Sequence, residues 1–201
     1  MTKIANLNKI YYGQLQLKSS DDWLITVLED FDAFLLDHAA NERKASAMAM
    51  SMVAHYPDKP DVLNAMIDLA LEELNHFRQV VKLMKNFGLQ PAGDEKDPYV
   101  NQIRKHLRDG KDHYFLDRLL SAAVIEARGA ERFERIAEAD VSSEICVFYR
   151  TLSRSERNHH HLFINLALNY FSKEEVCSRL DDWFAIEAEV ISNVKIRARL
   201  H

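Results

Sequence analysis

The chain has 201 residues, of which 47% are hydrophobic and 28% are charged, a composition typical of a globular protein with a buried core. It contains only 5 glycines and 4 prolines, which excludes an all-β sandwich or barrel with its many tight turns and favours helices. The net charge of −5 excludes a generically basic nucleic-acid-coating protein.

No targeting segment is expected. The first residues, MTKIANLNKIYYGQ, lack the apolar stretch of a signal peptide, and no apolar run approaches the ~18 residues of a membrane span. Cys146 and Cys177 are too few for a disulfide framework or a cysteine metal knuckle. We therefore expect a protein of the reducing cytoplasm that does not contact a membrane.

The predicted elements are all helices. Residues 1–18 show no helical period and are expected to be irregular. The apolar period then predicts helices over 20–56 (with a break near Glu29–Asp30), 60–87, 98–110, 112–139, 142–171 and 172–200. The residues expected to begin five of these helices are Asp58, Asp97, Asp112, Ser142 or Ser143, and Ser172.

The connections predict the topology. Tight turns at 57–60 and 140–142 indicate two antiparallel helical hairpins. The stretch from Gly88 to Asp112 is too long for a hairpin loop and indicates a crossover from one hairpin to the other. We expect an all-α, ferritin-like four-helix bundle with one long crossover and additional helices, formed as a single domain over 1–201.

Two E-x-x-H motifs fall on the predicted long helices. Glu73 is followed by His76, and Glu156 is followed by His159. Residues three apart lie on one face of a helix, so one metal ion can bind both side chains of a motif. In a chain this rich in glutamate the motif alone has little weight.

The spacing of two further glutamates has more weight. Glu42 precedes Glu73 by 31 residues, and Glu126 precedes Glu156 by 30 residues, with a predicted turn near the middle of each interval. Because both arms of a hairpin rise by the same amount per residue, the two carboxylates of each hairpin come level. Each hairpin thus presents one glutamate opposite one Glu-x-x-His.

These four carboxylates lie on apolar stripes. Tyr149 and Phe163, for example, stand seven residues before and after Glu156, which places them on its face of the helix. Burying four unpaired carboxylates is prohibitively costly unless cations neutralise them. Two divalent metal ions supply the four positive charges, and two neutral imidazoles complete the ligand set.

The six candidate metal ligands are therefore Glu42, Glu73, His76, Glu126, Glu156 and His159. Oxygen and imidazole ligands suit iron or manganese and argue against thiolate-bound metals. No catalytic residue beyond these ligands is predicted. For any one of them an exposed salt bridge is the alternative, and Glu72, His160 and His161 offer neighbouring registers.

Gly129 stands three residues after Glu126, where the other motif carries a histidine. Its missing side chain leaves room beside the metals for oxygen or substrate. Close packing of two helices at this point is the equally weighted alternative.

Four stretches of the chain resemble the MiaE family of tRNA hydroxylases: LLDHAANERKASAMAM, LALEELNHFRQV, AAVIEARGAERFERIA and YRTLSRSERNHHHLF. The resemblance covers nearly the whole chain. It implies an oxygen-dependent di-iron monooxygenase that hydroxylates the isopentenyl side chain of 2-methylthio-isopentenyladenosine in tRNA. It also implies that the six candidate ligands bind two iron ions per chain, manganese being the other metal they accept, beside a dry pocket for the prenyl group.

The partners follow from this resemblance. They are tRNA, contacted at its anticodon stem-loop, and a separate reductase, because the chain has no flavin, nicotinamide or iron–sulfur motif to hold an electron donor. A monomer or a small homo-oligomer is expected.

Basic residues that could contact phosphates occur in two places. In the crossover and near the C-terminus they are Arg104, Lys105, Arg108, Lys111, Lys195, Arg197 and Arg199, with His106 and His113 among them. A solvated helix face is the plainer interpretation. Arg128, Arg132 and Arg157 stand near the ligands in sequence and are expected to contact their carboxylates.

Three other functions stay open at this point. One is a different ferritin-like di-iron oxidase or peroxidase that acts on a small substrate. Another is a ferroxidase that stores iron, which requires a large hollow shell. The third is a metal-free helical protein that binds RNA or serves as a scaffold.

Overall fold

The computed structural model describes residues 11–201, and within that range it contains seven helices and no strand. The helices are α1 (Asp21–Glu29), α2 (Phe31–His55), α3 (Pro60–Asn86), α4 (Pro98–Arg104), α5 (Lys111–Glu138), α6 (Ser143–Leu168) and α7 (Lys173–Asn193). The all-α prediction is confirmed. Residues 11–20 form no helix, as expected, and the rest of the predicted irregular segment lies outside the described residues.

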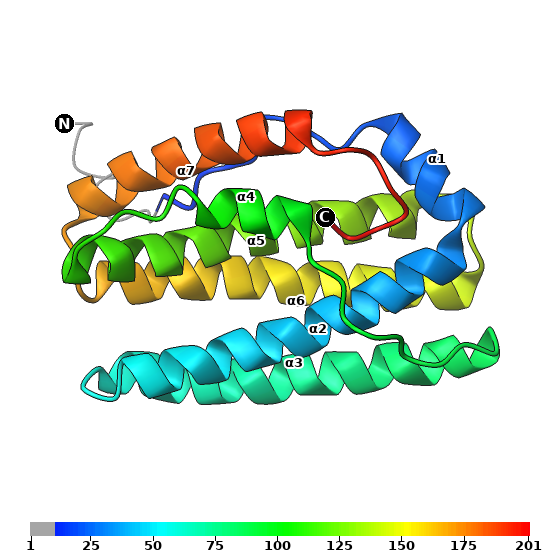
Figure 1. The fold of residues 1–201 in the computed structure, drawn as a ribbon, viewed down its shortest axis with the longest axis horizontal. Coiled ribbons are helices and arrows are strands. Elements are labelled where there is room, and N and C mark those ends of the chain that lie inside the picture. The colour runs from blue at the N-terminus through cyan, green and yellow to red at the C-terminus, as the bar shows by residue number, and fades with distance from the viewer. Residues whose placement is uncertain (1–10) are drawn as a thin grey trace, which may run out of the picture.

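The two predicted hairpins are present. Helices α2 and α3 pack along their length, as do α5 and α6, and α3 contacts α6 to join the pairs into a four-helix bundle (Figure 1). The connection from α3 to α5 runs back along the bundle and includes the short helix α4 (Figure 1). One long crossover between two antiparallel pairs is the ferritin-like arrangement.

Local signals explain most helix boundaries. The Asp30 carboxylate accepts a hydrogen bond from the Ala33 amide at 3.2 Å and separates α1 from α2 at the predicted break. Asp97, Ser142 and Ser172 cap α4, α6 and α7 in the same way.

Several boundary predictions were wrong. Lys59 rather than Asp58 precedes α3, and Gly110, with φ of 93°, precedes α5, which leaves Asp112 inside the first turn. Asp112 still lies favourably there, because the N-terminus of a helix attracts negative charge. Helices α4, α6 and α7 end earlier than expected, at residues 104, 168 and 193.

The end of the chain is held by side chains instead of continuing α7. The Leu200 amide donates to Asp37 at 2.9 Å, and the Leu200 carbonyl accepts from Arg132 at 2.6 Å. Trp23 donates its indole N–H to the Arg199 carbonyl at 2.9 Å. These tertiary contacts outweigh the helical propensity of residues 194–200.

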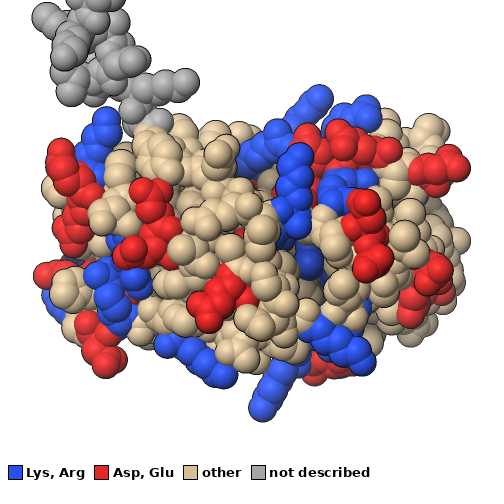
Figure 2. All heavy atoms as spheres, turned by 90° about the horizontal axis from the view of Figure 1, so that it is seen from above, with Lys and Arg blue, Asp and Glu red and all other residues tan. Residues whose placement is uncertain are grey.

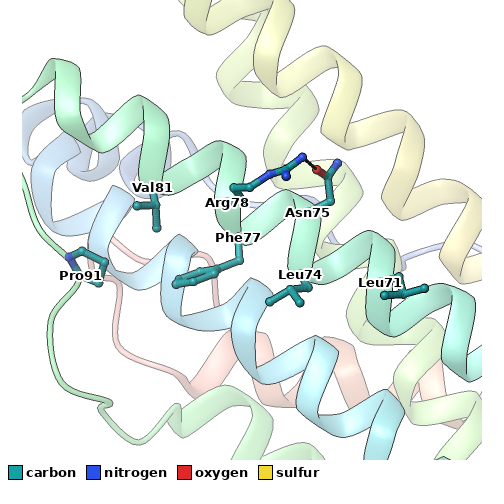
Figure 3. Close-up of a pocket in the computed structure, with 7 residues that line it drawn as sticks. All are labelled: Leu71, Leu74, Asn75, Phe77, Arg78, Val81 and Pro91. Carbon is teal, nitrogen blue, oxygen red and sulfur yellow. Dashed lines mark hydrogen bonds between the residues drawn. The ribbon is translucent and has the colours of Figure 1, made fainter.

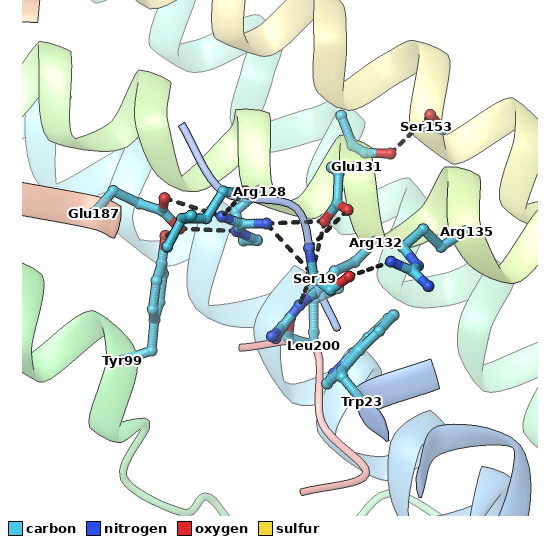
Figure 4. A network of polar contacts seen from close by, with 12 residues as sticks. Ser19, Trp23, Tyr99, Arg128, Glu131, Arg132, Arg135, Ser153, Glu187 and Leu200 are labelled. Carbon is cyan, nitrogen blue, oxygen red and sulfur yellow. Dashed lines mark hydrogen bonds and ion pairs between the residues drawn. The ribbon is translucent and has the colours of Figure 1, made fainter. Parts of the chain in front are cut away.

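A buried ion pair fixes the outer layer to the bundle. Arg128 on α5 forms two hydrogen bonds to Glu187 on α7, at 2.8 and 3.0 Å, and both side chains are fully buried (Figure 4). Tyr99 on α4 donates to the same carboxylate at 3.2 Å. Helices α4, α5 and α7 are therefore tied together at one point.

The apolar core has two parts, which lie on either side of the bundle's polar centre. One contains Met66 and Leu119, and the other contains Val80 and Phe133. Both parts combine side chains from the two hairpins, so apolar packing encloses the centre along the bundle axis. None of the described helices combines the length and apolar character needed to cross a membrane.

Candidate metal centre

Six buried side chains meet in the middle of the four-helix bundle. They form two groups of possible metal ligands: Glu42, Glu73, His76 and Glu156, and Glu73, Glu126, Glu156 and His159. Within each group, one ligand atom per residue lies within 4.8 Å of the others. The structure therefore brings together all six residues singled out from the sequence, with Glu73 and Glu156 common to both groups.

The two histidines stand between the carboxylates. The Nδ1 atom of His76 lies 3.2 Å from Glu73 Oε2 and 3.6 Å from Glu42 Oε2. The Nδ1 atom of His159 lies 3.0 Å from Glu73 Oε1 and 3.4 Å from Glu156 Oε2. Each E-x-x-H motif thus places its glutamate and histidine on one helix face, as helical geometry predicts.

Burial distinguishes the motif residues from their neighbours in sequence. The Glu73 side chain is 1% exposed, whereas that of Glu72 is 50% exposed. His160 faces away from the cluster, and its Nδ1 is hydrogen-bonded to the Ala123 carbonyl at 2.7 Å. The register chosen from the spacing is the one that faces inward.

The cluster carries protons in the absence of a cation. Burial raises the pKa of Glu42 and Glu126 well above the usual carboxyl range. Burial opposes protonation of His76, but hydrogen bonds with Glu42 and Glu73 raise its pKa to about 10. The pKa of His159 is raised to about 12 by its carboxylate neighbours against the same burial. Positive charge at this point is therefore strongly favoured, and a divalent ion supplies it without protons.

The polar atoms of the cluster fit a metal site. The Oε1 atoms of Glu73 and Glu156 and both ring nitrogens of His159 are buried and make no well-directed hydrogen bond with a described residue, although His159 Nδ1 lies 3.0 Å from Glu73 Oε1. Buried polar atoms are normally bonded in folded proteins, so this group indicates a missing ligand. Carboxylate oxygen and imidazole nitrogen are the donors that iron and manganese accept.

His38 is a residue of the site that the sequence analysis missed. It is fully buried on α2, and it is hydrogen-bonded through Nε2 to Glu42 Oε1 at 2.6 Å and through Nδ1 to the Tyr149 hydroxyl at 3.2 Å. Burial lowers the pKa of His38 to about 3, so the ring is neutral. Its position four residues before Glu42, on the same helix face, was the available signal.

Three arginines expected beside the carboxylates bond elsewhere. Their partners are Glu187 for Arg128, the Leu200 carbonyl for Arg132 and Glu134 for Arg157. Each helical residue is rotated by ~100° from the last, and the three arginines stand one position (Arg157), two positions (Arg128) and six positions (Arg132) from a ligand, so all three point to another face. That expectation was wrong for this geometric reason.

A cavity of about 680 Å³ leads to the cluster between α2, α4, α5 and the end of the chain. Glu42, Glu73, Glu126 and Glu156 line its buried end. Apolar side chains line part of its walls: Ala45, Met48, Val100, Leu107, Ala122 and Ile125. The arrangement places a largely apolar chamber beside the candidate metal ligands.

Gly129 lines this cavity. A Cβ atom built at this position would meet only the Cγ of Glu156, at 3.8 Å, which is ordinary van der Waals contact. Close helix packing therefore does not require a glycine here. Of the two interpretations left open by the sequence, the one that leaves room beside the carboxylates fits the structure.

Four basic side chains line the same cavity: Lys44, Lys96, Arg104 and Arg118. Of the basic residues proposed from the sequence, only Arg104 is among them. Arg108 is paired with Asp117, and Arg199 with Asp37 and Glu95. On the face seen from above in Figure 2, Lys and Arg are interspersed with Asp and Glu rather than gathered in one field.

A second hollow lies away from the cluster, on α3. Leu71, Leu74, Phe77 and Val81 line it together with Pro91 of the crossover (Figure 3). None of the six cluster residues lines it. The cavity between α2, α4 and α5 is thus the one of the two that reaches the carboxylates.

The chain is similar over most of its length to known proteins. Residues 7–201 match the family described as tRNA-(MS[2]IO[6]A)-hydroxylase (MiaE). The tRNA 2-(methylsulfanyl)-N(6)-isopentenyladenosine(37) hydroxylase of Pseudomonas putida is 33% identical over 181 residues, which cover 90% of this chain and 88% of the relative. The Salmonella typhimurium protein of the same description is 28% identical over 92% of this chain and 69% of its own length.

Among solved structures, the fold is similar to that of a Synechococcus protein with aldehyde deformylating oxygenase activity. The TM-score is 0.89 at 30% sequence identity, and the match covers 94% of this chain and 96% of the other. Sequence and structure comparisons therefore both cover almost the whole described chain.

Proposed function

Because this chain belongs to the MiaE family of tRNA hydroxylases, we propose that its reaction takes place beside two iron ions held by the central carboxylates and histidines. The substrate is 2-methylthio-isopentenyladenosine in tRNA, which is hydroxylated on the isopentenyl side chain. The observation that carries the proposal is the pair of ligand groups, which share two glutamates and open onto one cavity.

The six ligands of the proposal are Glu42, Glu73, His76, Glu126, Glu156 and His159. Their formal charge of about −4 matches two divalent ions, and neutral imidazoles complete the set. Glu73 and Glu156 belong to both groups, so each is suited to contact both ions. When bound, the iron ions supply the reduction of O2 that inserts one oxygen atom into an aliphatic C–H bond.

The chain's own residues bind and orient the substrate. The apolar walls, with Met48 and Ile125 among them, suit an isopentenyl group and exclude water from the reacting carbon. The space beside Gly129 lets that carbon approach the carboxylates. Lys44, Lys96 and Arg104 stand where they can contact phosphates of the anticodon stem-loop.

Electrons come from a separate reductase in this proposal. One atom of O2 becomes the hydroxyl group, and the other leaves as water with two electrons and two protons. No motif in the chain holds a flavin, a nicotinamide or an iron–sulfur cluster, so the donor binds from outside.

The test uses tRNA from cells that lack the hydroxylase. Protein loaded with iron(II) is given this tRNA, O2 and a chemical reductant, and digested nucleosides are analysed by mass spectrometry. We expect the 2-methylthio-isopentenyl nucleoside to gain one oxygen atom with wild-type protein and not with Glu156→Ala. A wild-type protein that binds iron but leaves the nucleoside unchanged would refute the proposal.

An aldehyde serves as the comparison substrate, because the similar Synechococcus protein has aldehyde deformylating oxygenase activity. Turnover of the aldehyde with no change in tRNA would assign the site to a small substrate instead.

A further inference from the structure

One wall of the cavity is built from the crossover and the last residues described. Asp97, just before α4, and His201 both line the cavity. The His201 side chain is 6% exposed, and its ring stacks on Tyr99 with centroids 4.9 Å apart and an interplanar angle of 9°. The imidazole is thus held in a fixed orientation at the cavity wall.

The ring nitrogens of His201 have no hydrogen-bond partner among the described residues. The Asp97 carboxylate lies beside the ring, with its Oδ2 atom 3.3 Å from Nδ1. Buried ring nitrogens are nearly always bonded, and a ring that lines a cavity can meet this need through a bound ligand. None of the six candidate metal ligands contacts His201, so the metal centre does not account for it.

Asp97 favours one tautomer of the imidazole. The Asp97 Oδ1 atom accepts a hydrogen bond from the Val100 amide at 3.1 Å, which favours the ionised carboxylate, and Oδ2 lies beside Nδ1 of His201. A carboxylate beside Nδ1 favours the proton on that nitrogen. The other nitrogen, Nε2, is then a hydrogen-bond acceptor.

We propose that His201 is a specificity-determining residue, whose Nε2 accepts a hydrogen bond from the N6–H of the bound base. This inference rests on the proposed function. In a 2-methylthio-N6-isopentenyladenine the N6–H is the base's single N–H donor, and the isopentenyl chain begins at the same nitrogen. A bond at N6 therefore recognises the base and fixes the point from which the chain extends toward the carboxylates.

The experiment measures binding of anticodon stem-loop RNA by fluorescence anisotropy with the iron-loaded protein. Three RNAs are compared: one with the 2-methylthio-isopentenyl base, one with unmodified adenine, and one in which an ether oxygen replaces N6–H. His201→Phe keeps an aromatic ring against Tyr99 and removes both nitrogens. His161→Phe is the matched control, because the His161 ring also lies against a tyrosine, Tyr12, with centroids 3.9 Å apart, outside this cavity.

We expect His201→Phe to weaken binding of the modified stem-loop about tenfold, the worth of one hydrogen bond to a buried group. The unmodified stem-loop, which keeps N–H at N6 but lacks the prenyl chain, measures how far wild type prefers the modified base. Wild type should bind the ether analogue about tenfold more weakly than the modified RNA. His201→Phe should bind the two alike. His161→Phe should behave as wild type, and His201→Gln, which keeps an acceptor, should recover part of the loss.

Thermal unfolding is recorded for every variant, so that a loss caused by misfolding is recognised, and the comparison of the modified and ether RNAs on wild type then decides. If His201→Phe distinguishes the ether analogue as wild type does, or if wild type binds the two RNAs alike, the inference is wrong and the proposed function stands. If wild type neither prefers the modified stem-loop nor hydroxylates it, the proposed function fails, and this inference fails with it.

Discussion

At Glu126 a carboxylate is buried on α5 in contact range of Glu73, Glu156 and His159. Its neighbours are mostly other acids, and burial disfavours its charge. A carboxylate is retained in such a place at a large cost in folding free energy. The cost is offset only when a cation is bound, which makes this residue the most direct probe of the centre.

We expect Glu126→Ala to reduce bound iron from about two ions per chain to one or fewer, because a structural ligand set loses affinity when one donor is removed. Metal analysis after iron(II) loading without oxygen measures this. Glu134→Ala, on the same helix but outside both groups, should keep the wild-type content. Two ions retained in Glu126→Ala would contradict the ligand assignment.

His38 orients Glu42 through its 2.6 Å hydrogen bond. We expect His38→Ala to weaken iron binding by about 10- to 100-fold, the usual effect of removing the partner of a metal ligand. Competition with a chelator of known affinity measures the change. His38→Gln, which keeps a donor, should restore part of it, and equal affinities in wild type and His38→Ala would exclude a positioning role.

Gly129→Ala separates stability from function. The new methyl group has room, and alanine in a helix interior is favoured over glycine by about 1 kcal/mol, so the free energy of unfolding should stay level or rise. Because the methyl group enters the cavity, hydroxylation should fall. Gly93→Ala, in the exposed crossover, is the control, and unchanged turnover in Gly129→Ala would show that this space is not used.

The six cluster residues could be predicted from the sequence because two independent features, the helix period and the spacing about each turn, select the same residues. The helix period fixes each face, and the intervals about each turn bring Glu42 opposite Glu73 and Glu126 opposite Glu156. His38 carried no comparable signal, since one histidine on an apolar face has many structural explanations. The place of His201 in the cavity could not be predicted from the sequence, because it depends on how the end of the chain folds back onto the bundle.

At the scale of elements, the boundaries that came out correctly are those set by local side chains. Asp30, Ser142 and Ser172 cap their helices through backbone amides within the same turn. The end of α7 was misplaced because the contacts that stop it come from α2 and α5. Local patterns cannot reveal such distant partners.

The caps give a matched pair of variants. Asp30→Ala should lower the free energy of unfolding by about 1 kcal/mol, because it removes the acceptor for the Ala33 amide. Asp58→Ala should have almost no effect, since Lys59 occupies the capping position of α3 and makes no side-chain cap. Urea denaturation compares the two, and an equal loss in both would mean that Asp58 does cap α3 in solution.

At the scale of the whole molecule, the polar centre lies between two apolar cores, and α4 and the end of the chain cover it. The buried Arg128–Glu187 pair fastens the outer helices over this arrangement. The fold class and the crossover followed from turn positions, whereas this outer layer depended on long-range pairs.

Removal of metal should destabilise the folded protein. A ligand present at 100 times its Kd stabilises the folded state by about 2.7 kcal/mol. Iron-loaded wild type should therefore unfold several degrees above the chelated protein, as differential scanning calorimetry would show. Glu126→Ala should show little difference between the two conditions. A wild-type melting temperature that the chelator does not change would argue against a resident metal.

Both ligand groups draw residues from both hairpins, since Glu73 comes from α3 and Glu156 from α6. Bound ions would thus cross-link two halves of the chain that the apolar cores and the exposed crossover around residues 89–96 also hold together. After cleavage of the backbone in that crossover, the two fragments should associate more tightly with metal than without it. The metal centre would then make the folding of the two hairpins more cooperative, in addition to its chemical role, because neither helical hairpin holds a complete group of ligands alone.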